Sequence, residues 1–152
     1  MAETVGTKKF MQICFVVKDA EQTMKNFMDV FGIEKGTPKQ IPAPENYDTF
    51  YHDKKINSKT KYYVFQMGDL TVELTQPDDT DSVWKEVFEK TGQGLCYMGI
   101  MVEDSAKAVK FLDAKGNKRI HHGGTADSNY NIVDTRDTLG FLLNVKMNRT
   151  SR

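Results

Sequence analysis

Phe15-Val16-Val17-Lys18-Asp19 and Ile100-Met101-Val102-Glu103-Asp104 are two copies of one pattern, and this repeat decides the fold. In each copy an apolar strand signal ends at an acidic residue that can cap a helix. Amphipathic helix patterns follow the two copies and end at Gly32 and Gly116. The recurrence of strand, tight turn and helix predicts two similar modules in one chain.

Further strand signals follow each predicted helix. Gly68-Asp69 separates two of them as a hairpin turn, whereas residues 37–61 are predicted to be a loop because Pro38, Pro42 and Pro44 interrupt them. The predicted strands are 10–17, 62–67, 70–75, 95–102, 118–122, 131–134 and 141–147.

These signals together predict an α+β fold. We expect two βαβββ modules, at about 8–77 and 94–148, joined by a linker helix at about 80–92. Two such modules give a curved mixed sheet around a cavity, and the 152 residues fit one domain.

The composition excludes several classes of function. Lys plus Arg and Asp plus Glu both number 21, so no basic surface for nucleic acid or an anionic membrane is expected. No apolar run reaches the roughly 20 residues of a membrane span, and residues 1–9 lack a signal-peptide core. Cys14 and Cys96 lie inside apolar runs, as reduced buried thiols do, so we expect a cytoplasmic protein.

Four motifs, in their order and spacing, resemble the vicinal-oxygen-chelate (glyoxalase-like) superfamily. This superfamily includes glyoxalase I, methylmalonyl-CoA epimerase, extradiol dioxygenases and bleomycin-type resistance proteins, and the epimerases are the members that the chain resembles most. The resemblance spans about residues 10–147 and implies a shared cavity and a homodimer. The motifs are Val17-Lys18-Asp19, Val72-Glu73-Leu74, Val102-Glu103-Asp104 and Asp137-Thr138-Leu139-Gly140-Phe141.

The resemblance also implies where a metal site would lie. Family members bring four ligands into the cavity, commonly His or Gln, Glu or Gln, His, and Glu. The matching positions here are Gln12, Glu73, Tyr97 and Asn144. Only Glu73 is a strong ligand for a divalent metal, because amide oxygens bind weakly and a phenol must first lose its proton. We therefore expect no functional metal and no other cofactor.

The same four residues suit proton removal next to a carbonyl group. Glu73 is the candidate base, with a pKa raised by burial, and Tyr97 is the candidate donor to the developing enolate oxygen. Gln12 and Asn144 would orient the substrate. We predict a metal-independent racemase or epimerase that acts on a small, aromatic carbonyl compound. The dihydrodaidzein racemases of isoflavone-reducing gut bacteria, whose substrate is an isoflavanone, are similar in size and resemble the epimerases.

Other side chains are weaker candidates for the site. His52, His121 and His122 are the only histidines, and histidine is the usual acid-base residue type near neutral pH, so each is a candidate acid-base group, although a solvated loop position is the simpler explanation. Tyr63 and Met98 are candidates for lining an apolar pocket around a flat substrate.

Two other functions remain open from the sequence. One is a non-catalytic protein that binds a small aromatic compound, as metal-free resistance members of the family do. The other keeps a metal, with Glu73 joined by His121 or His122, in a metal-dependent acyl-CoA epimerase or lyase.

Overall fold

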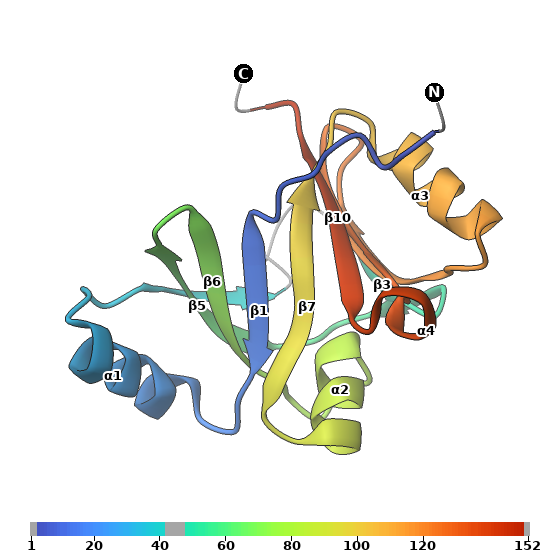
Figure 1. The fold of residues 1–152 in the computed structure, drawn as a ribbon. Helices are drawn as coiled ribbons and strands as arrows, with labels where there is room; N and C mark the ends of the chain where they lie inside the picture. The colour runs from blue at the N-terminus through green and yellow to red at the C-terminus, as the bar shows by residue number, and fades with distance from the viewer. Residues whose placement is uncertain (1–2, 42–47, 151–152) are drawn as a thin grey trace.

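The computed structural model describes residues 3–41 and 48–150, and its described strands form one mixed sheet (Figure 1). The strand order is β2-β5-β6-β1-β7-β10-β9-β8-β3-β4, and β1 and β7 pair antiparallel in the middle of the sheet. The α+β class and the curved mixed sheet are as predicted. The strands are β1 (Gln12–Val16), β2 (Thr37–Ile41), β3 (Thr49–Tyr51), β4 (Lys54–Ile56), β5 (Thr60–Met67), β6 (Leu70–Gln76), β7 (Gly94–Met101), β8 (Arg119–Gly124), β9 (Ser128–Val133) and β10 (Leu142–Asn148).

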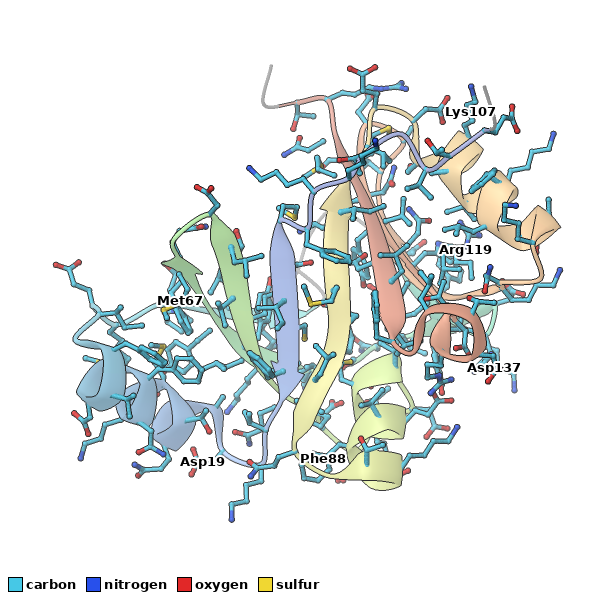
Figure 2. The ribbon with its side chains drawn as sticks, viewed as in Figure 1. Asp19, Met67, Phe88, Lys107, Arg119 and Asp137 are labelled. Atoms are coloured by element: carbon cyan, nitrogen blue, oxygen red, sulfur yellow. The ribbon has the colours of Figure 1, made fainter. Side chains whose placement is uncertain are left out.

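The two repeated helices begin at the acidic residues of the repeated pattern. Asp19 accepts a hydrogen bond from the backbone N–H of Gln22 at 2.9 Å and caps α1 (Ala20–Phe31). Figure 2 labels Asp19 beside this helix. Asp104 caps α3 (Ser105–Ala114) in the same way. These caps satisfy backbone donors that the first helical turn would otherwise leave free.

Helices cover both faces of the sheet. α1 packs against β5 and β6, and α3 packs against β9 and β10, so both cover the outer, convex face. The linker helix α2 (Val83–Thr91) packs on the inner face, against β1 and β7. A short helix, α4 (Arg136–Leu139), precedes β10. In Figure 1, α2 lies at one end of the central strands β1 and β7, and it closes that end of the trough.

Chain connectivity requires the sheet to curl. β2 lies at one edge of the sheet and β3 lies next to the other edge. A flat sheet would place these two strands roughly 38 Å apart, at about 4.8 Å between neighbours. The chain from 41 to 49 can span at most about 28 Å when fully extended. The two edges must therefore approach each other, and the inner face becomes a trough.

The loop predicted for residues 37–61 is partly wrong. It contains β2, which tolerates Pro38 because an edge strand needs no N–H at that position, and the hairpin β3–β4. His52 and Asp53 form the turn of this hairpin with φ values of 47° and 61°, the left-handed conformation of a tight β-hairpin turn. The hairpin pairs with β8 of the other half, which no local pattern could indicate. Pro42 and Pro44 lie outside the described residues.

No helix in the described part of the chain is both long and apolar enough to cross a membrane.

Candidate active site

A cavity of about 320 Å³ opens on the inner face of the sheet. Its walls come from both halves of the chain, and Trp84 of α2 contributes to its lining. All four residues at the family's ligand positions lie at this cavity or are hydrogen bonded within it. The residues that line it are Lys39, Tyr62, Glu73, Trp84, Tyr97, Met101, Gly124, Ser128, Asn129, Tyr130, Asn144, Lys146, Met147 and Asn148.

Strand alternation sends Glu73 into the cavity. Its neighbours Val72 and Leu74 belong to the core beneath α1 on the outer face, so the side chain between them points inward. Glu73 is buried, with 9% of its surface exposed. The sequence pattern predicted this orientation correctly.

A β-bulge helps to aim Tyr97. Cys14 of β1 lies opposite Tyr97 of β7, but the next residue, Phe15, lies opposite Leu95, so Cys96 is the extra residue. Bulges turn side chains that a regular strand would direct elsewhere. Here both Cys96 and Tyr97 are buried on the inner face, and the Tyr97 hydroxyl reaches across β1 towards Glu73.

The four polar residues form one continuous hydrogen-bonded chain. Asn144 Nδ2 donates to Gln12 Oε1 at 3.1 Å, and Gln12 Nε2 donates to Glu73 Oε1 at 2.5 Å. The Tyr97 hydroxyl donates to the other carboxylate oxygen, Oε2, at 2.9 Å. Each oxygen of Glu73 is thus held by its own donor, and the carboxylate has one fixed orientation.

Gly99 makes this chain of hydrogen bonds possible. In the sheet register it lies directly between Gln12 on β1 and Asn144 on β10. A Cβ atom at position 99 would come within 2.6 Å of Gln12 Oε1 and 2.8 Å of Gln12 Cβ. Only a residue without a side chain lets the two amides meet above β7.

One buried acceptor in the cavity has no partner among the described residues. Asn144 is 2% exposed, and its Oδ1 atom makes no hydrogen bond there. Buried polar atoms are rarely left unpaired, so a donor from a ligand or a water molecule fits this position.

Burial raises the pKa of Glu73 above its ordinary value. The ammonium groups of Lys146 and Lys39 and the hydrogen bonds from Tyr97 and Gln12 act in the opposite direction. The result is a carboxyl group that binds a proton more readily than an exposed glutamate. A raised pKa is what a general base needs near neutral pH.

Burial also raises the pKa of the Tyr97 hydroxyl, and the nearby Cys14 and Glu73 reinforce the effect. Trp84 Nε1 lies near this hydroxyl, although its geometry falls short of a hydrogen bond. Tyr97 is therefore a hydrogen-bond donor and not a phenolate.

Two predicted substrate-binding residues face away from the cavity. Tyr63 lies beneath α1, where its hydroxyl donates to Glu21, and its neighbour Tyr62 lines the cavity instead. Met98 lies opposite Ile13 and Leu143 on the outer face, and Met101 takes the inner position. The two predictions are wrong for the same reason. Side chains alternate along a strand, so residues an odd number of positions apart point to opposite faces.

The structure does not bring the three histidines to Glu73. His52 is exposed in the β3–β4 turn. His122 faces outward and stacks on Phe50, with ring centroids 4.9 Å apart. His121 is completely buried beside α2, where Nδ1 accepts from the backbone N–H of Val83 and burial lowers its pKa to about 3.

The sequence interpretation did not identify Lys39, Trp84 or Lys146, which also line the cavity. The position of Lys146 could be predicted from the sequence, because it lies two residues beyond Asn144 on the same strand and therefore on the same face. Lys39 belongs to a strand that was not predicted, and Trp84 depends on how α2 packs.

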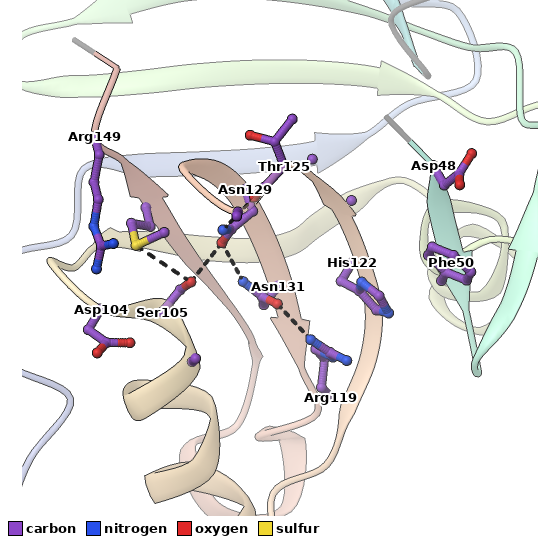
Figure 3. Close-up of a pocket in the computed structure, with 15 residues that line it drawn as sticks. Asp48, Phe50, Asp104, Ser105, Arg119, His122, Thr125, Asn129, Asn131 and Arg149 are labelled. Atoms are coloured by element: carbon purple, nitrogen blue, oxygen red, sulfur yellow. Dashed lines mark hydrogen bonds between the residues drawn. The ribbon is translucent and has the colours of Figure 1, made fainter. Parts of the chain in front are cut away.

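A larger groove of about 1170 Å³ lies on the outer face of the second half (Figure 3). Ser105 Oγ donates to Asn129, and Arg119 donates to Asn131 at 3.1 Å, so its polar groups bond one another. Its lining contains two acidic side chains, Asp48 and Asp104, and two basic ones, Arg119 and Arg149. This groove contains none of the four residues at the family's ligand positions.

Comparison with known proteins identifies the family. The model of the glyoxalase/bleomycin resistance protein/dioxygenase superfamily matches residues 11–132. The chain belongs to this superfamily. None of the curated proteins matches it in sequence.

Several solved structures share the fold of the chain. A hypothetical protein from Bacillus halodurans C-125 has a TM-score of 0.67 at 13% identity, covering 93% of this chain and 94% of that one. Methylmalonyl-CoA epimerase from Mycobacterium tuberculosis has a TM-score of 0.60 at 18% identity, with 99% and 94% covered. A variant of the Streptomyces coelicolor methylmalonyl-CoA epimerase, in complex with 2-nitronate-propionyl-CoA, has a TM-score of 0.62 at 15% identity, with 94% and 96% covered. At these identities the similarity shows the fold alone.

The residues at the superfamily's metal position do not fit a divalent metal. Gln12 turns its amide nitrogen, which cannot bind a metal, towards Glu73 and gives its oxygen to Asn144. Tyr97 keeps its proton, and Glu73 is the one anionic donor of the set. In residues 3–41 and 48–150, no three His, Cys, Asp or Glu side chains lie close enough together to share a metal ion.

Proposed function

We propose that this protein is a metal-independent racemase or epimerase that removes a proton next to a carbonyl group, with Glu73 as the base. The observation that carries this proposal is a buried carboxylate of raised pKa that faces a small cavity and is held by two donors. Methylmalonyl-CoA epimerases are among the solved structures that share the fold of the chain, and this likeness supports an epimerase-type reaction.

The proposed reaction begins when Glu73 takes the α-proton. The C–H bond breaks, its electron pair moves into the carbonyl group, and an enolate forms. A protonated carboxyl accepts hydrogen bonds more weakly than a carboxylate, so the Tyr97 hydroxyl becomes available to the enolate oxygen. The carbon is inverted when the planar enolate turns over in the cavity before Glu73 returns the proton, and the original configuration is restored when the proton returns to the face that it left.

The cavity walls support an aromatic substrate. Tyr62, Trp84, Tyr97 and Tyr130 contribute rings to the lining, and rings stack on flat apolar ligands. The volume of about 320 Å³ is at the small end for ligand pockets, so it encloses a compound of two or three rings better than a complete acyl-CoA. We propose an isoflavanone of the dihydrodaidzein type, whose α-proton lies between a carbonyl and an aromatic ring.

The test is hydrogen exchange in D₂O, followed by NMR on an isoflavanone. Glu73→Gln should reduce α-proton exchange by at least about 100-fold, because a positioned base contributes about that much or more. The exposed Glu34→Gln is the matched control and should exchange like the wild type. The rate of exchange should rise with pH as Glu73 loses its proton, and this rise should occur at a higher pH than the usual glutamate pKa of about 4.3. Exchange should persist after treatment with a chelator. Full exchange in Glu73→Gln would remove Glu73 as the base.

A binding protein without catalysis is the second candidate. It is supported by the same hydrogen bonds, because both oxygens of Glu73 already have donors and the buried charge is satisfied without a reaction. In that case the wild type would bind an isoflavanone saturably, without α-proton exchange, and Glu73→Gln would bind it equally well.

A further inference from the structure

Two lysines line the cavity from opposite walls. Lys39 lies on β2 in the first half, and Lys146 lies on β10 in the second half. In the register of the sheet Lys39 is opposite Tyr62, and Lys146 is opposite Tyr130. Each wall therefore presents a neighbouring lysine and tyrosine to the cavity.

The ammonium groups of these lysines have no ion-pair or hydrogen-bond partner within residues 3–41 and 48–150. Among the described lining residues, Glu73 is the only acidic side chain, and its two oxygens are already held by Gln12 and Tyr97. The cavity thus carries an excess of positive charge that its own walls do not neutralise. Concave sites lined by one sign of charge attract ligands of the opposite sign.

Polarity also increases along the trough. On β10, Leu142 lies in the apolar core with Trp84, Asn144 lies in the hydrogen-bonded chain, and Lys146 is partly exposed. Successive inward residues on a strand are about 6.6 Å apart. A ligand with its reactive carbon at Glu73 therefore meets the ring of Trp84 at the closed end and the ammonium group of Lys146 towards the open end.

We propose that the cavity recognises an aromatic compound with an anionic substituent, a carboxylate or a phenolate, which Lys39 and Lys146 bind from the two walls. This proposal names the substrate class of the proposed racemase. It rests on the racemase function for the carbonyl group of the substrate, but not for the anionic substituent. The lysines would determine specificity, because an ammonium group in a partly enclosed site prefers an ionised ligand to a neutral one of the same shape.

Binding of matched small aromatic compounds tests this proposal without any turnover. The first pair is benzoate and benzamide, and the second is 4-nitrophenolate and 4-nitroanisole, each titrated into the ¹⁵N-labelled protein and followed by NMR. The ionised member of at least one pair should bind about tenfold more tightly to the wild type, since two partly exposed ion pairs contribute to it. The pair with the larger preference shows which substituent the site selects.

The variants Lys39→Met and Lys146→Met keep most of the side-chain length and remove the charge. The double variant should lose the preference for the ionised compound, whereas Lys107→Met, an exposed lysine on α3, should retain it (Figure 2). Equal binding of ionised and neutral compounds, no binding of either ionised compound, or a preference that survives in the double variant would each overturn the proposal. A lysine-dependent preference without α-proton exchange on an isoflavanone would leave this inference standing and would contradict the proposed racemase.

Discussion

Gly99 has no side chain, and the hydrogen bonds of four polar residues depend on that. We expect Gly99→Ala to lower the free energy of unfolding by about 1–3 kcal/mol, the usual cost of overfilling a packed site. The added Cβ would meet both the amide oxygen and the Cβ of Gln12, which would have to move away from Glu73. Urea unfolding of the variant and the wild type measures the difference.

A double variant distinguishes the contact between the new Cβ and Gln12 from a general effect of alanine on the stability of β7. Gln12→Gly removes the three atoms that lie nearest to the new Cβ. Gly99→Ala should therefore cost clearly less in the Gln12→Gly background than in the wild type. Equal costs in both backgrounds would show that Gly99 does not act through Gln12.

Single residues also show where sequence reasoning is reliable and where it fails. Glu73 was placed correctly because Val72 and Leu74 mark the opposite face of a regular strand. Tyr63 and Met98 are predicted for the cavity from their residue types, but both lie on the outer face, because that face is set by the alternation of side chains along the strand. The bulge at Cys96 shows that even the alternation can be interrupted by a feature that only the neighbouring strand reveals.

At the scale of elements, His121 of β8 anchors helix α2 to the inner face. Its Nδ1 accepts from the backbone N–H of Val83 at 3.4 Å, its Nε2 lies 3.3 Å from the Tyr130 hydroxyl, and its ring packs edge-on against Trp84. The ring must be neutral to accept from a backbone N–H. Burial accordingly lowers the pKa of His121 to about 3.

The lowered pKa predicts a specific sensitivity to acid. Between the unfolded pKa of about 6.5 and the folded pKa of about 3, the unfolded chain binds a proton that the folded chain does not. Acidification through this range should therefore lower the free energy of unfolding by up to about 1.4 kcal/mol per pH unit through His121 alone. Urea unfolding of His121→Gln from neutral to acidic pH should show a correspondingly smaller slope, even if the variant is less stable at neutral pH.

The matched control for this element is His52→Asn, because His52 lies exposed in the hairpin turn and Asn tolerates its positive φ. It should keep the pH slope of the wild type. A slope in His121→Gln that equals that of the wild type would show that His121 does not supply the acid sensitivity.

At the scale of the whole molecule, the two halves share one sheet and one inner core. That core takes residues from both halves, including Val16 of β1 and Leu142 of β10, around Trp84. The hairpin β3–β4 of the first half pairs with β8 of the second. Neither half can lose its structure without exposing the core of the other.

We therefore expect the chain to unfold in one cooperative transition. Trp84 is the only tryptophan, and it is completely buried where the halves meet, so its fluorescence reports on the shared core. Urea transitions followed by Trp84 fluorescence and by far-UV circular dichroism should coincide. Phe50→Ala, which removes the ring stacked on His122, should shift both transitions together. Two separated transitions would show that the halves fold independently.

The sequence by itself determined the repeated strand and helix and the acidic caps, and its resemblance to the superfamily indicated the four positions of the candidate site. The repeat and the caps depend on local periods and on residues close together in the chain, so they can be predicted without a structure. The tertiary structure alone decided that Gly99 lets Gln12 meet Asn144, that the hairpin crosses to β8, and that Lys39 and Trp84 reach the cavity. Each of these depends on strand register or on packing between distant segments, and such non-local contacts have no period along the sequence.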